Sequence, residues 1–131
     1  MNILFLMNTT GIGGTETFTL ELCNYINSMG SNVSILNMQN SYLLESSSKK
    51  YSIDYYSISG INITKIHKTI KMIRKSNIDI VMGYGMNVSM LLLFVKMALP
   101  MIKIIIGIRG LLTWRKAYVI RMLNIAETIS C

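Results

Sequence analysis

The chain has 131 residues, of which 51% are hydrophobic and 15% charged, and thirteen Lys and Arg against six Asp and Glu give a formal net charge of +7. This length fits one domain, and so apolar a composition suits a sheet covered on both faces. The most apolar stretch, 90–106, is interrupted by Lys96 and Pro100, so no transmembrane helix is predicted. The start lacks the basic segment of a signal peptide, and the two cysteines lie far apart in the sequence. These features favour a cytoplasmic protein without disulfides.

The first half of the chain alternates apolar runs with one amphipathic stretch. Apolar runs predict strands over 2–8, 32–38 and 52–58. Helical spacing predicts a helix over 15–29 that ends at Gly30. Four of its residues are expected to face the core: Phe18, Leu22, Ile26 and Met29. The polar, serine-rich segment 39–50 is predicted to be a loop.

The second half continues the alternation. It predicts helices over 63–75, 86–99 and 113–123 and strands over 78–82, 101–108 and 127–131. The Ile-rich run 101–108 is typical of a strand buried on both sides. Alternating strands and helices imply a doubly wound α/β domain with a mainly parallel, six-stranded sheet and right-handed crossovers.

Positive charge is concentrated on the predicted helix 63–75. Its apolar face is expected to comprise Ile63, Ile66, Ile70 and Ile73. The cations are expected on the opposite face: Lys65, Lys68, Lys71, Arg74 and Lys75. One interpretation is an ordinary solvated face. The other is attraction to an anionic membrane surface, which would make the protein peripheral at the inner face of the plasma membrane. Nucleic acid is not an expected partner, because no aromatic residues interleave with these cations.

Glycines follow three of the predicted strands. In doubly wound sheets, ligands bind outside the carboxyl ends of the strands, where the loops 8–14, 83–87 and 109–113 are expected. The first of these loops precedes a helix, and exposed backbone N–H groups at such a point suit a phosphate or diphosphate. The sequence of this loop fits neither the dinucleotide fingerprint nor the Walker A motif, since Glu16 replaces the third glycine and no Gly-Lys-Ser/Thr occurs.

Gly13-Gly14-Thr15-Glu16 after a first strand resembles the Gly-Gly-x-Glu loop of the retaining GT-B glycosyltransferases of family 4. Three later segments are also similar to that family's amino-terminal domain: Asn-Ile-Asp-Ile-Val at 77–81, Ile-Gly-Ile-Arg-Gly at 106–110 and Ala-Glu-Thr-Ile-Ser at 126–130. The resemblance covers nearly the whole chain. It implies one half of a GT-B architecture, with 1–131 as the acceptor-side Rossmann-like domain and the carboxyl-terminal donor-binding domain absent.

The resemblance also implies roles for individual residues. A loop beside the donor diphosphate would comprise Gly11, Gly13, Gly14 and Thr15. The acceptor side would include Gly83, Tyr84, Gly85 and Asn87. Arg109 stands where many members have a histidine near the transferred sugar, and an arginine there would contact sugar or phosphate without shuttling protons.

The implied reaction moves a sugar from a nucleoside-diphosphate sugar to a polysaccharide or glycolipid acceptor, with retention and without a metal or other cofactor. The chain alone is expected to be inactive. Two alternatives remain open from the sequence. One is a non-catalytic Rossmann-like module that binds a nucleotide or phosphate, and the other is a membrane-surface interaction domain.

Overall fold

Parallel strands and helices alternate along the computed structural model, which describes residues 1–107. The strands are β1 (Asn2–Met7), β2 (Asn32–Asn37), β3 (Asp54–Ser57), β4 (Ile80–Tyr84) and β5 (Lys103–Gly107). The helices are α1 (Gly14–Ser28), α2 (Tyr42–Lys50), α3 (Asn62–Lys75) and α4 (Met86–Ala98). All pairings in the sheet are parallel, in the order β3-β2-β1-β4-β5. The predicted doubly wound α/β class is confirmed, while the predicted helix 113–123 and strand 127–131 lie outside the described residues.

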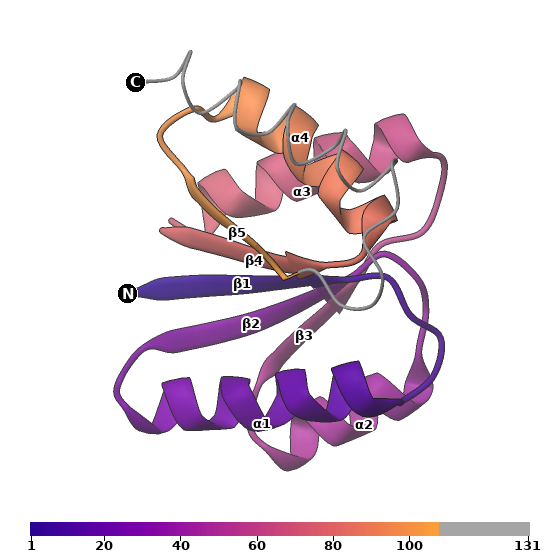
Figure 1. Ribbon diagram of the computed structural model, residues 1–131, viewed down its shortest axis with the longest axis vertical. Coiled ribbons are helices and arrows are strands. Elements are labelled where there is room, and N and C mark those ends of the chain that lie inside the picture. The colour runs from indigo at the N-terminus through magenta and orange to yellow at the C-terminus, as the bar shows by residue number, and fades with distance from the viewer. Residues whose placement is uncertain (108–131) are drawn as a thin grey trace.

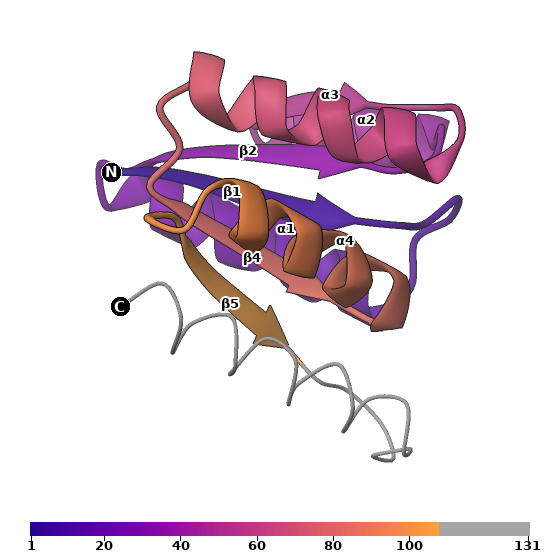
Figure 2. The same ribbon diagram turned by 90° about the horizontal axis from the view of Figure 1, so that it is seen from above.

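The helices form a layer on each face of the sheet, with α1 and α2 on one side and α3 and α4 on the other (Figure 1). The chain winds outward from β1 to β3, then crosses back to β4 beside β1 and winds outward the other way. Right-handed crossovers in opposite directions place helices on opposite faces. Seen from above, β2, β1, β4 and β5 rotate progressively across the sheet (Figure 2). The winding reverses between β1 and β4, which is therefore the switch point.

The central strand β1 supplies both halves of the core. Leu4 and Leu6 pack into the cluster beneath α3 and α4, and Ile3, Phe5 and Met7 pack into the cluster beneath α1 and α2. Successive strand residues point to opposite faces, so a strand with helices on both sides has consecutive apolar residues, as β1 has from Ile3 to Met7.

The predicted loop 39–50 is wrong, because Tyr42–Lys50 form helix α2. Ser41 caps this helix: its Oγ accepts a hydrogen bond from the Leu44 backbone N at 3.2 Å. Leu44 and Ser48 are fully buried, and the Ser48 hydroxyl donates to the Leu44 carbonyl oxygen at 2.8 Å. Serines that cap a helix, as Ser41 does, or bond to its backbone, as Ser48 does, are therefore compatible with a helix here.

The predicted inner face of α1 is partly wrong. Phe18 and Met29 are 43% and 69% exposed, while Thr19, Leu20 and Cys23 are the buried residues of this helix. The face of α1 that packs on the sheet is therefore rotated from the predicted one and is centred on Thr19, Leu20 and Cys23. The Thr19 hydroxyl donates to the Thr15 carbonyl oxygen at 2.8 Å, which lets a polar residue occupy that face.

Two other burial predictions are corrected. Ile63 was expected on the apolar face of its helix, but it is 76% exposed in the first turn of α3. Strand β5 is not buried on both sides within residues 1–107, since Ile105 is 47% exposed. It is the outermost strand of the described sheet, and α4 covers it on one side.

Candidate functional site

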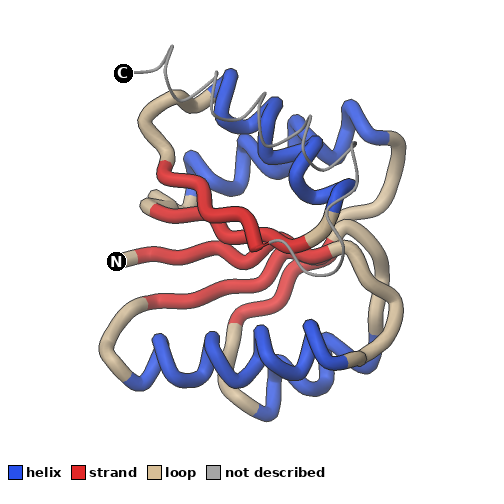
Figure 3. The backbone as a smooth tube through the Cα atoms, viewed as in Figure 1, coloured by secondary structure: helices blue, strands red, loops and turns tan. Residues whose placement is uncertain are grey.

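The carboxyl ends of the strands meet at one edge of the sheet, opposite the amino-terminus. Figure 3 shows the loops that follow β1, β2 and β3 at this edge. Asn8 follows β1, and Met38 and Gln39 follow β2, so residues far apart in sequence lie together there. The Gln39 side-chain amide donates to the Asn8 Oδ1 at 2.7 Å and joins the two loops.

A buried amide fixes the start of the glycine loop, residues 8–14. Asn37, fully buried at the end of β2, donates from Nδ2 to the Thr9 carbonyl oxygen at 2.8 Å. Its Oδ1 accepts from the Thr9 backbone N at 3.1 Å, and Nδ2 also donates to the Tyr55 hydroxyl at 3.2 Å. Further along the loop, the Ser41 hydroxyl donates to the Thr10 carbonyl oxygen at 3.1 Å. The loop is thus held in position before any ligand arrives.

The chain's own side chains already contact the backbone of the glycine loop. The Gly13 backbone N donates to the Glu16 Oε2 at 2.8 Å, so a carboxylate occupies the N-terminal end of α1. The Gly11 backbone N donates to the Thr9 Oγ1 at 3.3 Å. A Cβ at Gly11 or Gly14 would meet no atom within 4 Å. The surface beside these two glycines is therefore open, and the assignment of the loop and Thr15 to a donor diphosphate stays a prediction.

A cavity of about 510 Å³ lies at this edge, between the amino-terminal turns of α3 and α4. It adjoins the switch point, where ligands of doubly wound sheets bind. Its polar lining comes from four different segments: Asn8, Gln39, Asn62, Lys65 and Asn87. Its apolar lining is Met38, Ile66, Met90, Leu91 and Phe94. Lys65 is the one ionisable group among these described residues, so the cavity can bind and orient a ligand but offers no carboxylate or imidazole for acid–base chemistry.

Of the four predicted acceptor-side residues, only Asn87 lines this cavity. Gly83 is buried beneath α4, where an added Cβ would overlap the Val88 Cγ1 and lie 2.9 Å from the Leu92 Cδ1. Tyr84 packs on the opposite face of the sheet, and its ring occupies the space that a Cβ at Gly107 would need. Gly85 precedes α4 with φ +89°, a conformation that favours glycine. Gly83, Tyr84 and Gly85 therefore have roles in packing and backbone geometry, and the assignment of the four residues to the acceptor side stays a prediction.

The basic residues of α3 do not share one environment. Lys68, Lys71, Arg74 and Lys75 are exposed, whereas Lys65 is half-buried and lines the cavity. Sequence reasoning grouped Lys65 with the cations of a membrane-facing helix side, and it did not name Gln39 or Asn62 as site residues. The spacing of Lys65, Thr69 and Ile73 could have indicated that Lys65 points inward, because residues four apart share a helix face. Thr69 and Ile73 are buried, so the same face reaches the cavity at Lys65.

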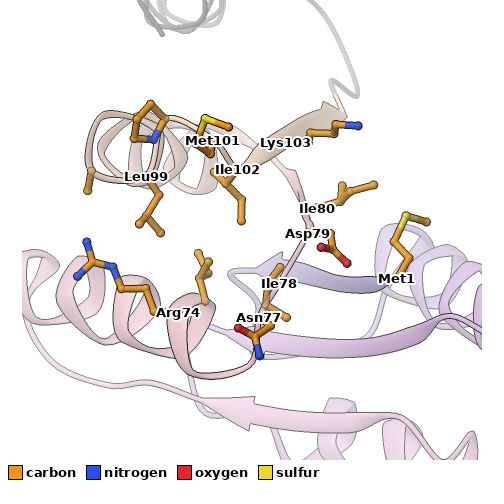
Figure 4. Close-up of a pocket in the computed structure, with 13 residues that line it drawn as sticks. Met1, Arg74, Asn77, Ile78, Asp79, Ile80, Leu99, Met101, Ile102 and Lys103 are labelled. Carbon is orange, nitrogen blue, oxygen red and sulfur yellow. The ribbon is translucent and has the colours of Figure 1, made fainter. Parts of the chain in front are cut away.

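A larger cavity, of about 650 Å³, lies at the opposite, amino edge of the sheet. Figure 4 shows Leu99 and Ile102 at this cavity, with Arg74 and Lys103 among the residues around it. Its acidic residue, Asp79, accepts a hydrogen bond from the Asn2 backbone N at 2.8 Å. Because the amino edge is not where such sheets bind ligands, the smaller cavity is the candidate site.

The remaining reactive groups of the described part do not form a second centre. Burial raises the pKa of the Cys23 thiol to about 12, which makes it a packing residue and not a nucleophile. No three His, Cys, Asp or Glu residues gather to hold a metal ion within residues 1–107. Arg109 lies outside the described residues, and its predicted role stays a prediction.

Solved structures share this fold. A glycosyltransferase from Rickettsia africae ESF-5 matches with a TM-score of 0.71 at 18% identity, over 89% of this chain and 32% of its own. Acinetobacter baumannii MurG matches with a TM-score of 0.72 at 17% identity, over 93% and 39%. Anabaena Alr3699/HepE, in complex with UDP, matches with a TM-score of 0.77 at 9% identity, over 99% and 40%. The chain therefore spans about a third to two fifths of these proteins.

No curated protein sequence matches the chain significantly. A family model does, under the description "Glycosyl transferase 4-like", over residues 2–128. The match covers nearly the whole chain and includes the glycine loop, the cavity and the parallel sheet described above. The Rossmann-like sheet is of the kind found in GT-B glycosyltransferases, and the chain belongs to the glycosyl transferase 4-like family.

Proposed function

We propose that this chain is the acceptor-side, amino-terminal domain of a glycosyltransferase that moves a sugar from a nucleoside-diphosphate sugar to a glycan or lipid-linked acceptor. The supporting observation is the cavity between α3 and α4, which adjoins the switch point and the glycine loop in a chain of this family. The UDP bound to Alr3699/HepE favours a nucleotide-linked donor. Retention of configuration and independence of metals are part of the proposal.

The cavity also supports the proposal that the chain alone does not catalyse transfer. Lys65 is its one ionisable lining residue within the described part, and no general acid or base accompanies it. Sugar transfer requires donor and acceptor to be held together in reacting geometry. A second domain that grips the nucleotide would supply what this cavity lacks.

Transfer by the complete protein encoded by the gene tests the proposal. Purified protein is incubated with a panel of nucleotide sugars and lipid-linked or glycan acceptors, with and without EDTA, and the product's anomeric configuration is read by NMR. The expected result is EDTA-resistant transfer with retention by the complete protein and none by residues 1–131. Hydrolysis or transfer by residues 1–131 alone would contradict the proposal that a second domain is needed for catalysis. Absence of transfer from every donor with the complete protein would contradict the proposed reaction.

A second candidate function is docking to an anionic membrane surface. Four cations of α3 are exposed, none of them forms an ion pair within residues 1–107, and Ile61 and Ile63 are 70% and 76% exposed at the start of the same helix. In the described part, no helix is long and apolar enough to cross a membrane. Each cation near an anionic surface contributes about 1 kcal/mol, and salt screens the attraction.

Vesicle flotation separates this function from an ordinary solvated helix face. The wild type is compared with a variant that carries Lys68→Glu, Lys71→Glu and Lys75→Glu, on anionic and on neutral vesicles at low and high salt. We expect binding to anionic vesicles at low salt that the variant loses. Equal binding to both vesicle types, or equal binding by the variant, would contradict the membrane function.

A further inference from the structure

The cavity between α3 and α4 is selective in its charge. Among the described residues that line it, four carry side-chain amides, one carries an ammonium group and none carries a carboxylate. Amides bind neutral and anionic groups alike, whereas a lysine ammonium only donates and carries positive charge. A neutral sugar gains little from such a cation, while a phosphate forms charge-assisted hydrogen bonds with it. The lining therefore favours an anionic ligand.

Lys65 is placed for this contact by the register of α3. It shares one helix face with Thr69 and Ile73, which are 0% and 3% exposed against the sheet. Lys65 lies on this face two turns before Ile73, where the face borders the cavity, and it is half-buried there. Its alkyl stem can cover apolar surface while the ammonium group contacts a ligand. Lys65 is in this respect unlike the exposed cations of α3.

No acidic side chain competes for this cation from the elements around it. The first turns of α3 and α4 contain no acidic residue, whereas α1 and α2 carry Glu16 and Glu45 in theirs. The only ion pair within residues 1–107 joins Lys49 to Glu45 on α2. The positive field at the cavity is thus not neutralised by the described part of the chain.

The other wall of the cavity is apolar and partly open. Met90 and Phe94 follow one another by one turn of α4 and are 39% and 45% exposed, while Leu91 beside them is buried. Side chains of this kind gain free energy when an apolar group covers them. A ligand that fits both walls carries a phosphate next to an apolar portion.

We propose that this cavity binds the acceptor through a phosphate group, that Lys65 selects this group, and that Met90 and Phe94 contact the apolar portion beside it. The identification of the ligand as the acceptor rests on the proposed function. The binding of a phosphate-bearing amphiphile at this cavity does not depend on it. A donor diphosphate has the same anionic chemistry, so the test includes an arm for each source.

Titration calorimetry with geranyl phosphate, geraniol, inorganic phosphate and UDP tests the proposal on the full chain. We expect geranyl phosphate to bind more tightly than geraniol or inorganic phosphate, because it alone engages both walls. Lys65→Met should weaken geranyl phosphate binding by at least about tenfold, the order of one charge-assisted hydrogen bond, and leave geraniol unchanged. Lys65→Arg should restore binding to within about threefold.

Lys50→Met is the matched control, since it removes the same charge from an exposed position on α2. It should bind geranyl phosphate as the wild type does. Phe94→Ser should weaken geranyl phosphate but not inorganic phosphate. Equal losses in Lys65→Met and Lys50→Met, or geraniol binding as tight as that of geranyl phosphate, would overturn the proposal. UDP that displaces geranyl phosphate and depends equally on Lys65 would assign the cavity to the donor and also overturn it.

Kinetics of the complete protein separate this proposal from the proposed function. If transfer occurs, Lys65→Met should raise the acceptor KM at least about tenfold and leave the donor KM unchanged. Transfer to a phosphate-free acceptor with unchanged KM in Lys65→Met would overturn the phosphate contact while the glycosyltransferase function stands. Absence of transfer with Lys65-dependent binding of geranyl phosphate would overturn the proposed function while the binding site stands.

Discussion

Asn37→Ala should be among the most destabilising polar substitutions in the described part of the chain. Asn37 is fully buried and makes three hydrogen bonds, two with the Thr9 backbone and one with the Tyr55 hydroxyl. Each bond contributes about 1 kcal/mol net, and the two half-buried Thr9 backbone groups would lose their partner. We therefore expect a loss of about 3 kcal/mol, a large share of the roughly 5–15 kcal/mol typical of a folded domain.

The measurement is urea denaturation followed by far-UV circular dichroism. Asn32→Ala is the matched control, because Asn32 lies on the same strand but is exposed, and its side chain donates to the Asn2 Oδ1 at 3.0 Å. It should cost less than about 1 kcal/mol. Tyr55→Phe should cost about 1 kcal/mol, and its effect should largely disappear in the Asn37→Ala background. Equal losses in Asn37→Ala and Asn32→Ala would refute the inference that Asn37 anchors the glycine loop.

Three other predictions concern single positions. A Cβ at Gly14 would meet open space, so Gly14→Val should change the free energy of unfolding by less than about 1 kcal/mol. It should nevertheless lower donor use by the complete protein at least about tenfold, and unchanged transfer kinetics would show that the loop is only a structural turn. Gly83→Ala should cost about 1–3 kcal/mol in urea denaturation, because the Cβ overlaps Val88, and wild-type stability would show that α4 does not pack so closely on β4. Folding raises the pKa of Cys23 from 9.0 to about 12, so the folded state holds this proton more tightly and the free energy of unfolding should fall between pH 9 and 12. Cys23→Ala should reduce that slope, and an identical slope would contradict the burial of the thiol.

The doubly wound parallel class and the edge of the sheet that carries the candidate cavity could be predicted from the sequence. Apolar runs marked β1, β2 and β4, and right-handed crossovers left few topologies for an alternating chain. Helix α2 was missed because serines favour loops on average, whereas here Ser41 caps the helix and Ser48 bonds to its own helix backbone.

The cavity itself could not be predicted, because it depends on helix phase and on packing between distant segments. Asn8 and Asn87 are 79 positions apart, and only the β1–β4 pairing brings their elements together. Lys65 was grouped with the exposed cations because charge alone suggested one face. Thr69, one turn further on the same face, is buried against the sheet, and its hydroxyl donates to the Lys65 carbonyl oxygen at 2.8 Å, which lets a polar residue occupy that face.

We propose that substrate binds at the carboxyl edge of the sheet, between α3 and α4. It is tested most directly by a ¹⁵N NMR titration of the full chain with geranyl phosphate. We expect the largest changes in chemical shift at the cavity residues Asn8, Gln39, Lys65 and Asn87, and we expect Lys65→Met to abolish them. Shift changes centred on Arg74, Asn77 and Lys103, at the larger cavity of the amino edge, would contradict it.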